Sequence, residues 1–221
     1  MTEKTTYKKN VLIIVLALSL IVTFMIGGTL SYLHDKAEPL TNHLTFINNS
    51  NDNRIKAVLE EVWNPEDGLN LIPGAIVEKK PSIKNISTAD ISEWAGIQII
   101  FEKLADDGIT ATVMTPAEVE KLLLIMDINY NSEEWTKESN VNGDTNAIRY
   151  FYNEIIAPNE STLDLFSEVK IKDTTTNEQI DMVAEFAPGG INIRIEGAVV
   201  QGELLTQTEA KEELIALLPI D

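Results

Sequence analysis

Apolar residues divide the chain into one long N-terminal run and a series of shorter segments. Residues 11–26 form the run, and three lysines lie within the nine residues before it. Paired glycines and small residues follow the run. A basic stretch, an apolar stretch and a small-residue zone in this order are typical of a secretory signal peptide. We therefore predict a signal peptide over residues 1–31, cleaved between Ser31 and Tyr32.

An uncleaved membrane anchor is the alternative for this N-terminal segment. The apolar run and the residues after it just reach the roughly 20 apolar residues that a membrane-spanning helix needs. In both cases the chain beyond Ser31 lies outside the membrane, which it contacts only through the N-terminal segment.

The next segment, residues 32–50, is predicted to be an extended N-terminal strand. Leu40, Leu44 and Phe46, together with Asn42, are spaced two apart and share one face of such a strand. A marginal strand beside a new N-terminus can pair within its own sheet. It can also add to the open sheet edge of a neighbouring molecule, so we identify this segment as a candidate donor strand.

Residues 51–221 show many short strand patterns separated by turn residues, with no break in composition. The clearest strands are predicted at 94–101, 147–152 and 191–201, and a polar turn is predicted at 173–178. This pattern predicts one mainly β domain, an antiparallel β-sandwich with a few short peripheral helices.

Local signals mark two helices and one interruption. Thr115 with Glu118, and Thr206 with Glu209, have the spacing of capping boxes, so a helix is predicted after each threonine. Pro81 interrupts an alternating stretch and predicts a break in that strand.

The composition is acidic and lacks cysteine. The chain has 17 basic and 35 acidic residues, and 14 and 34 of them remain after residue 31. Such a charge excludes nucleic acid and anionic lipid as favourable partners. A domain of this size can fold on its hydrophobic core without disulfides.

Catalytic and cofactor patterns are missing from the sequence. His34 and His43 are the only histidines, and their spacing is not that of paired zinc ligands on a helix. There is no thiol nucleophile, no nucleophile elbow and no phosphate-binding glycine loop. The sequence therefore predicts a protein that is not an enzyme and holds no cofactor.

One polar loop has the spacing of oxygen ligands. Asn140, Asn142, Asp144 and Asn146 offer an oxygen at every second position, as calcium loops do. The segment lacks the distal glutamate of an EF-hand, so we interpret it as a polar loop and keep these residues as calcium candidates.

The processing region resembles that of exported proteins cut by a SipW-type signal peptidase, the TasA and camelysin group. Its matching residues are Gly27, Gly28, Thr29, Tyr32 and Asp35. The rest of the chain is similar to the BsaA-like branch of biofilm matrix proteins. The similar segments are residues 60–63, 71–74, 79–85, 135, 150–152, 157–162, 165–166 and 193–201. Ser31 stands where alanine is common in this group, and Asn159 stands where glycine is frequent.

The resemblance implies a jelly-roll sandwich that is exported by a Gram-positive bacterium and polymerises into extracellular fibres of the biofilm matrix or cell surface. The segment at the N-terminus freed by cleavage would be the donor strand for another copy. The SipW-type peptidase and other matrix or minor fibre subunits would be further partners. The resemblance also makes Lys36 a candidate for an intermolecular covalent bond. Two alternatives stay open: a camelysin-like secreted metalloprotease, and a membrane-anchored accessory or minor fibre subunit.

Overall fold

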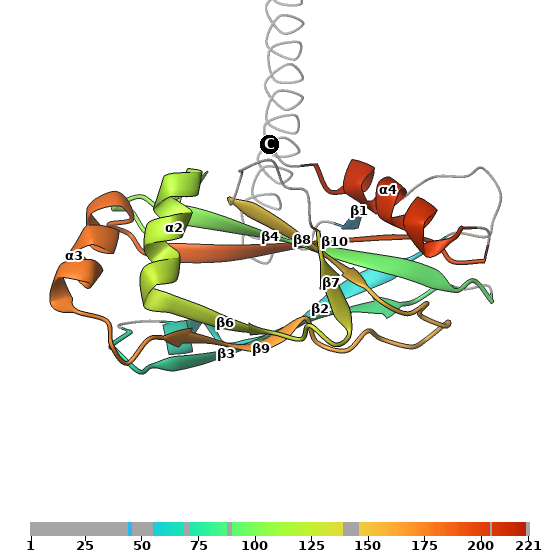
Figure 1. The fold of residues 1–221 in the computed structure, drawn as a ribbon, viewed down its shortest axis with the longest axis horizontal. Helices are drawn as coiled ribbons and strands as arrows, with labels where there is room; N and C mark the ends of the chain where they lie inside the picture. The colour runs from blue at the N-terminus through green and yellow to red at the C-terminus, as the bar shows by residue number, and fades with distance from the viewer. Residues whose placement is uncertain are drawn as a thin grey trace, which may run out of the picture. The chain divides into compact units, whose positions relative to one another are not determined.

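The computed structural model describes residues 44–45, 55–68, 71–87, 90–138, 146–203 and 205–219 (Figure 1). The strands are β1 (Leu44–Thr45), β2 (Ala57–Trp63), β3 (Ile76–Asn85), β4 (Glu93–Leu104), β5 (Ala111–Val113), β6 (Met126–Tyr130), β7 (Trp135–Lys137), β8 (Ala147–Tyr152), β9 (Phe166–Ile171) and β10 (Ile191–Gln201). The helices are η1 (Pro65–Gly68), α2 (Pro116–Ile125), α3 (Asn177–Phe186) and α4 (Gln207–Leu217).

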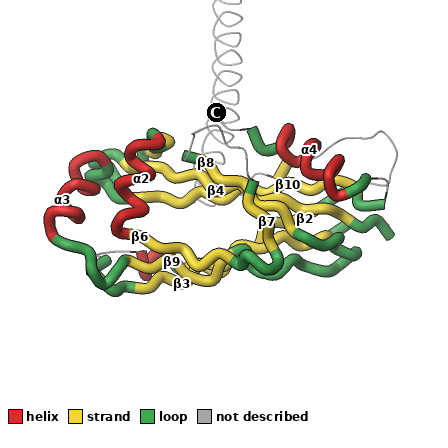
Figure 2. The backbone as a smooth tube through the Cα atoms, in the orientation of Figure 1, coloured by secondary structure: helices red, strands yellow, loops and turns green. Residues whose placement is uncertain are grey.

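The strands form two sheets that face each other (Figure 2). The larger sheet has the order β1-β10-β4-β8-β7, with β5 also paired to β4, and the smaller has the order β2-β3-β9-β6. Neighbouring strands are antiparallel except β1 and β10, which are parallel. The predicted mainly β, antiparallel sandwich with short peripheral helices is confirmed.

The chain passes from one sheet to the other in the manner of a jelly roll. Strands β3, β6 and β9 belong to the smaller sheet, and β4, β8 and β10 alternate with them in the larger sheet. As a result, β9 pairs with β3 and β10 pairs with β4. Strands distant in sequence thus become neighbours in both layers, which is the arrangement of a double-sheet jelly roll.

The main hydrophobic core fills the space between the sheets. Alternate residues of β4 face this core, including Ile97, Ile99 and Phe101, none of which is exposed. Helix α2 adds Val119 and Leu122 at one end, where α2 also contacts α3. Among the side chains that the structure describes, those of this core lie between positions 55 and 199.

Helix α4 covers part of the outer face of the larger sheet. Its Ala210 and Leu214, with Leu218 just after it, are buried against Ala198 and Val200 of β10. Gly96 on β4 allows this close approach, because a Cβ there would lie 3.3 Å from Leu218 Cδ1. The outer face of this sheet therefore has an apolar part that belongs to the folded unit.

The described residues contain three α-helices, where two were predicted for the domain. Thr115 and Thr206 cap α2 and α4 through complete capping boxes, which confirms both predicted starts. The predicted polar turn at 173–178 holds at residues 173–174, but its last two residues belong to α3, which begins at Asn177. Thr176 and Gln179 form a third capping box there, with glutamine in place of glutamate.

The predicted strand break at Pro81 is wrong, since β3 runs through this residue. The Pro81 carbonyl accepts from the Leu165 N–H at 2.9 Å, on the side of β3 away from β2. The proline nitrogen points to the same side, where β9 pairs with β3 only at Ile76–Glu78. The missing N–H therefore removes no bond from the β2–β3 ladder.

Asn159 adopts the left-handed conformation, with a φ of 66°. Glycine is the usual residue in this conformation, and asparagine is among the few others that adopt it readily. The turn at this position therefore keeps the geometry that glycine favours.

The predicted boundaries at residues 31 and 50 and the signal helix lie outside the described residues. The chain divides between Thr41 and Asn42, and all the described residues belong to the second unit, Asn42–Asp221. Within the described ranges, no helix has the length and apolar character needed to cross a membrane.

Leu214→Ala tests the contribution of the α4 contact. The substitution removes a fully buried side chain beneath the helix, so we expect it to lower the free energy of unfolding by about 2–4 kcal/mol. Glu213→Ala, at the exposed neighbouring position, should change it by less than about 0.5 kcal/mol. Urea unfolding followed by circular dichroism measures both, and equal losses would show that α4 contributes no packing energy.

Candidate functional site

Strand β10 is paired very differently along its two edges. On one edge all its residues, Ile191–Gln201, pair with β4 in an antiparallel ladder. On the other edge, the described residues pair with it at only two positions, Leu44 with Gly197 and Thr45 with Ala198. Main-chain groups along a strand edge are strong hydrogen-bonding groups, so this edge is a candidate site for strand addition.

The core-facing side of β10 is covered unevenly. Ile195 and Val199 are buried in the core, with exposed fractions of 4% each. Ile191 and Ile193 point to the same side but are only partly buried. The first half of β10 therefore has apolar side chains that an additional strand could cover further.

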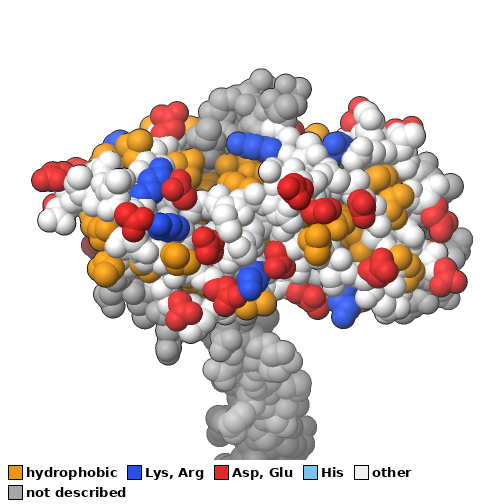
Figure 3. Space-filling model, turned by 60° about the horizontal axis from the view of Figure 1, so that its bottom comes forward, with side chains coloured by type: hydrophobic (Ala, Val, Ile, Leu, Met, Phe, Trp, Pro, Cys, Tyr) orange, Lys and Arg blue, Asp and Glu red, His pale blue; other side chains and the backbone are white. Residues whose placement is uncertain are grey.

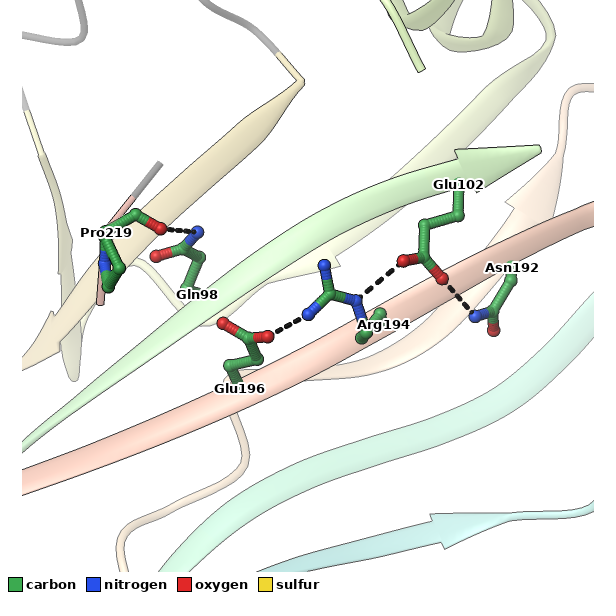
Figure 4. Close-up of polar contacts among 6 residues, drawn as sticks. All are labelled: Gln98, Glu102, Asn192, Arg194, Glu196 and Pro219. Atoms are coloured by element: carbon green, nitrogen blue, oxygen red, sulfur yellow. Dashed lines mark hydrogen bonds and ion pairs between the residues drawn. The ribbon is translucent and has the colours of Figure 1, made fainter. Parts of the chain in front are cut away.

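The outer side of the same stretch carries a polar network (Figure 4). Arg194 Nε lies 2.7 Å from Glu102 Oε1, and the Arg194 guanidinium also binds Glu196. Asn192 donates from Nδ2 to Glu102 Oε2 at 2.7 Å. Two carboxylates therefore share one guanidinium beside the open edge of β10.

Gln98 and Arg149 hold the chain that follows α4 against this face. Gln98 donates from Nε2 to the Pro219 carbonyl at 3.0 Å, and Arg149 donates from Nε to the Leu218 carbonyl at 2.5 Å. Arg149 also pairs with Glu138 at 2.7 Å. The apolar part under α4 and the polar network thus meet at residues 218–219.

A second polar cluster lies where β2, β3 and β4 meet. Glu93 Oε1 accepts from the Ser87 hydroxyl at 2.6 Å and from the Lys56 N–H at 3.2 Å. Asn85 donates from Nδ2 to the carbonyls of Ile91 and Ile156. Glu93 thereby joins the beginning of β4 to the residue that precedes β2.

Glu93 is a carboxyl group with an unusual protonation equilibrium. Its side chain is fully buried, and Oε2 has no hydrogen-bond partner. Burial raises the pKa of Glu93 from 4.5 to about 7, although the hydrogen bonds from Ser87 and Lys56 oppose this shift. The cluster therefore changes its charge close to neutral pH.

A buried ion pair lies on the core-facing side of the smaller sheet. Lys79 Nζ is 2.6 Å from Glu61 Oε1, and both side chains are less than a tenth exposed. Lys79 Nζ also lies 4.9 Å from the centroid of the Trp63 ring. Burial lowers the pKa of Lys79, while Glu61 acts in the opposite direction. This pair has a structural explanation, because each charge has a partner and the indole covers the ammonium.

Figure 3, which turns the lower side of Figure 1 forward, shows acidic and basic side chains interspersed with apolar ones. On the smaller sheet, Lys80 pairs with Glu78, and Lys170 Nζ lies 2.6 Å from Asp173 Oδ2. Acidic side chains predominate in this view, in keeping with the net charge of −18. No patch of basic side chains for an anionic ligand is seen on this face.

Most residues singled out in the sequence lie outside the described ranges. Of the candidate donor strand, Leu44 is described, and it belongs to β1. Of the calcium candidates, Asn146 is described. It immediately precedes β8, and its buried side-chain oxygen has no hydrogen-bond partner. The other candidates, Ser31, Tyr32, His34, Lys36, Leu40, His43, Phe46, Asn140, Asn142 and Asp144, are not described.

The part of the chain that the structure describes contains no group of three or more His, Cys, Asp or Glu side chains placed to hold a metal ion. The calcium prediction stays a prediction, since three of its four residues lie outside that part.

Sequence reasoning missed the Glu93 cluster, the Glu61–Lys79 pair and the Arg194 network. Glu61, Lys79 and Glu93 each occupy a core-facing position in a strand. A charged residue where the alternation calls for an apolar one is the signal that could have revealed them. The partners of Arg194 depend on the β4–β10 register, which the local sequence does not specify.

The fold and the unevenly paired edge define a jelly-roll sandwich with a candidate strand-addition site. Neither a scan against protein-family models nor a search of curated proteins gives a match for this chain.

Glu93→Gln tests the buried carboxyl. Because the folded-state pKa is raised, the folded chain holds this proton between about pH 4.5 and 7 while the unfolded chain releases it. Glu93 therefore favours the folded state most at low pH, and that contribution is lost as the pH rises through this window. A glutamine side chain cannot ionise, so we expect the variant to gain about 1–3 kcal/mol over the wild type on going from pH 4.5 to pH 8.

Urea midpoints measured at pH 4.5 and pH 8 give this difference. Glu60→Gln, at an exposed position of β2, is the matched control and should follow the wild type at both pH values. A Glu93→Gln profile parallel to that of the wild type would contradict a raised pKa.

Proposed function

We propose that the protein is a secreted structural subunit of extracellular fibres in a biofilm matrix. In this proposal, a SipW-type signal peptidase removes residues 1–31 and frees the segment 32–50 as a donor strand. The donor strand of one copy adds to the open edge of β10 in another copy. The role is structural and not catalytic, and the partners are further copies and other matrix or minor fibre subunits.

The parallel pairing of β1 with β10 is the observation that carries this proposal. It brings Leu44 and Thr45, from the predicted donor strand, to the edge of β10 that is otherwise little paired among the described residues. This pairing lies within one chain, and it supports the proposal because residues of the predicted donor strand fit this edge. Pairing along such an edge supplies main-chain hydrogen bonds, and alternate side chains supply specificity.

The observed register also accounts for the apolar spacing of the donor strand. A donor that continues the pairing of Leu44 with Gly197 brings Leu40 opposite Ile193 and Phe46 opposite Val199. These positions of β10 all lie on its core-facing side. Because opposed residues on neighbouring strands share a face, the donor's apolar set would cover the partly buried part of the core.

Strand addition of this kind is heterologous, because the donor segment and the acceptor edge are different surfaces. Heterologous contacts that do not close into a ring produce filaments. Each added copy brings a further β10 edge, so growth can continue in one direction.

A deletion within the mature protein tests the proposal. The chain beginning at Tyr32 should form filaments visible by electron microscopy. Deletion of residues 32–47 should leave the sandwich folded, because the core side chains that the structure describes lie within residues 55–218, but should abolish the filaments.

Circular dichroism and the thermal midpoint provide the folding control for the deletion variant. Mixing in the deletion variant should also shorten wild-type filaments, because it has an acceptor edge but no donor strand. Filaments of normal length formed by the deletion variant alone would overturn the donor-strand mechanism.

A further inference from the structure

Glu93 is a buried carboxyl group without a counterion among the described residues. The residue has no exposed surface, and within the described ranges its Oε2 accepts no hydrogen bond. Its Oε1 accepts from the Ser87 hydroxyl at 2.6 Å and from the Lys56 N–H at 3.2 Å. Ionisation in this position therefore leaves a buried, charged oxygen without a donor, which is far less favourable than burial of a neutral carboxyl group.

The charged residues on the elements around Glu93 do not compensate it. These residues are Lys56, Lys84, Asp90, Glu154, Glu160 and Glu203. Lys56 reaches Glu93 through its main-chain N–H. The pKa of Glu93 accordingly responds to burial and to the hydrogen bonds from Ser87 and Lys56, and to no neighbouring charge of the described chain.

The main chain of Glu93 is held on two sides. Glu93 and Ile156 donate to each other's carbonyls at 2.9 and 2.8 Å, and Glu93 also pairs with Gln201 of β10. Asn85 supports the same region, because its Nδ2 donates to the carbonyls of Ile91 and Ile156. The start of β4 is therefore fixed, and the carboxyl group cannot reach water by a movement of its own strand.

The other side of the carboxyl group is covered by residues close to the surface. Lys56 precedes β2 and Ser87 follows β3, so neither lies within a strand. Lys56 is only partly buried, and Ile86, beside Ser87, is 38% exposed. The Lys56 N–H donates to Ser87 Oγ at 2.9 Å, and the Ile86 N–H donates to the Lys56 carbonyl at 2.8 Å. Such irregular segments near the surface open at a lower free energy than core strands.

We propose that Lys56, Ser87 and Glu93 form a pH-sensitive latch at this corner of the sandwich, closed while Glu93 is protonated and opening locally when it ionises. In the open form Lys56 and Ser87 move away from the carboxyl group and admit water to it. The pairing of β2, β3 and β4 is kept. The latch is independent of the proposed fibre function.

The direction of the pH dependence follows from the two protonation equilibria. Burial raises the pKa of Glu93 from 4.5 to about 7 in the closed form, and contact with water returns the pKa towards 4.5 in the open form. Opening therefore releases a proton between these pH values and becomes up to about tenfold more favourable for each pH unit in this window. Above about pH 7 both forms are ionised and the effect levels off. The latch is thus closed at acidic pH and loosest at and above neutral pH.

Amide hydrogen exchange, corrected for the intrinsic rate at each pH, tests the latch. Between pH 5 and pH 8 the Lys56 amide should lose at least about tenfold in protection in the wild type. In Glu93→Gln it should change by less than about threefold, because glutamine keeps an acceptor oxygen but cannot ionise. Asp90→Asn is the matched control. It removes an exposed carboxylate from the same connection and should follow the wild type.

Low concentrations of urea separate local opening from unfolding of the sandwich. The Glu93 amide donates to the Ile156 carbonyl and reports the loss of β4 pairing. At pH 8 the Lys56 amide should exchange at least about tenfold faster than the Glu93 amide, at a rate that urea does not change, because a local opening exposes little surface.

The proposal is overturned if the Lys56 and Glu93 amides exchange together with the same urea dependence, since the opening would then be global. It is also overturned if Glu93→Gln loses as much protection as the wild type between pH 5 and pH 8. The thermal midpoint shows whether Glu93→Gln folds, and the comparison of the two wild-type amides is decisive even where the variant does not.

Discussion

The antiparallel ladder between β4 and β10 determines how the rest of the molecule is arranged. It runs the full length of β10 and connects the centre of the larger sheet to its edge. Its inner side chains form much of the core with β3 and β9, and its outer side chains bind α4 and the polar network. Because β10 pairs with β4 along its whole length, the pairing of its other edge is the part of this strand's pairing that can vary.

A strand as long as β10 that has so few described pairs on one side needs protection against indiscriminate pairing. Charged side chains on an edge are one means that natural sheets use to restrict which strands can add. Arg194 and Glu196 occupy such positions, while α4 covers the apolar Ala198 and Val200 further along the strand. The side chains of this edge therefore restrict which strands can pair with it, although the described residues pair with its main chain at only two positions.

The sequence predicts the fold class because strong local signals agree with it. Alternation across residues 191–201 and two capping boxes indicate β10, α2 and α4 correctly. The failures have local causes: Pro81 lies where its nitrogen faces away from the β2–β3 ladder, and α3 begins with a capping box that uses glutamine. The candidate site is harder to predict. Arg194 meets Glu102 only through a strand register set by distant segments, and no local pattern encodes such a pairing.

Leu44 and Thr45 pair with β10 of their own chain, so they would compete with a strand from another copy for the same edge. Residues 46–56 separate β1 from β2, and a short tether gives the attached strand an effective concentration in the millimolar range. An incoming strand therefore gains only by pairing along more of β10 than these two positions. For a fibre subunit, this pairing within the chain would hinder premature assembly during export. It would also favour elongation of existing filament ends over the initiation of new filaments.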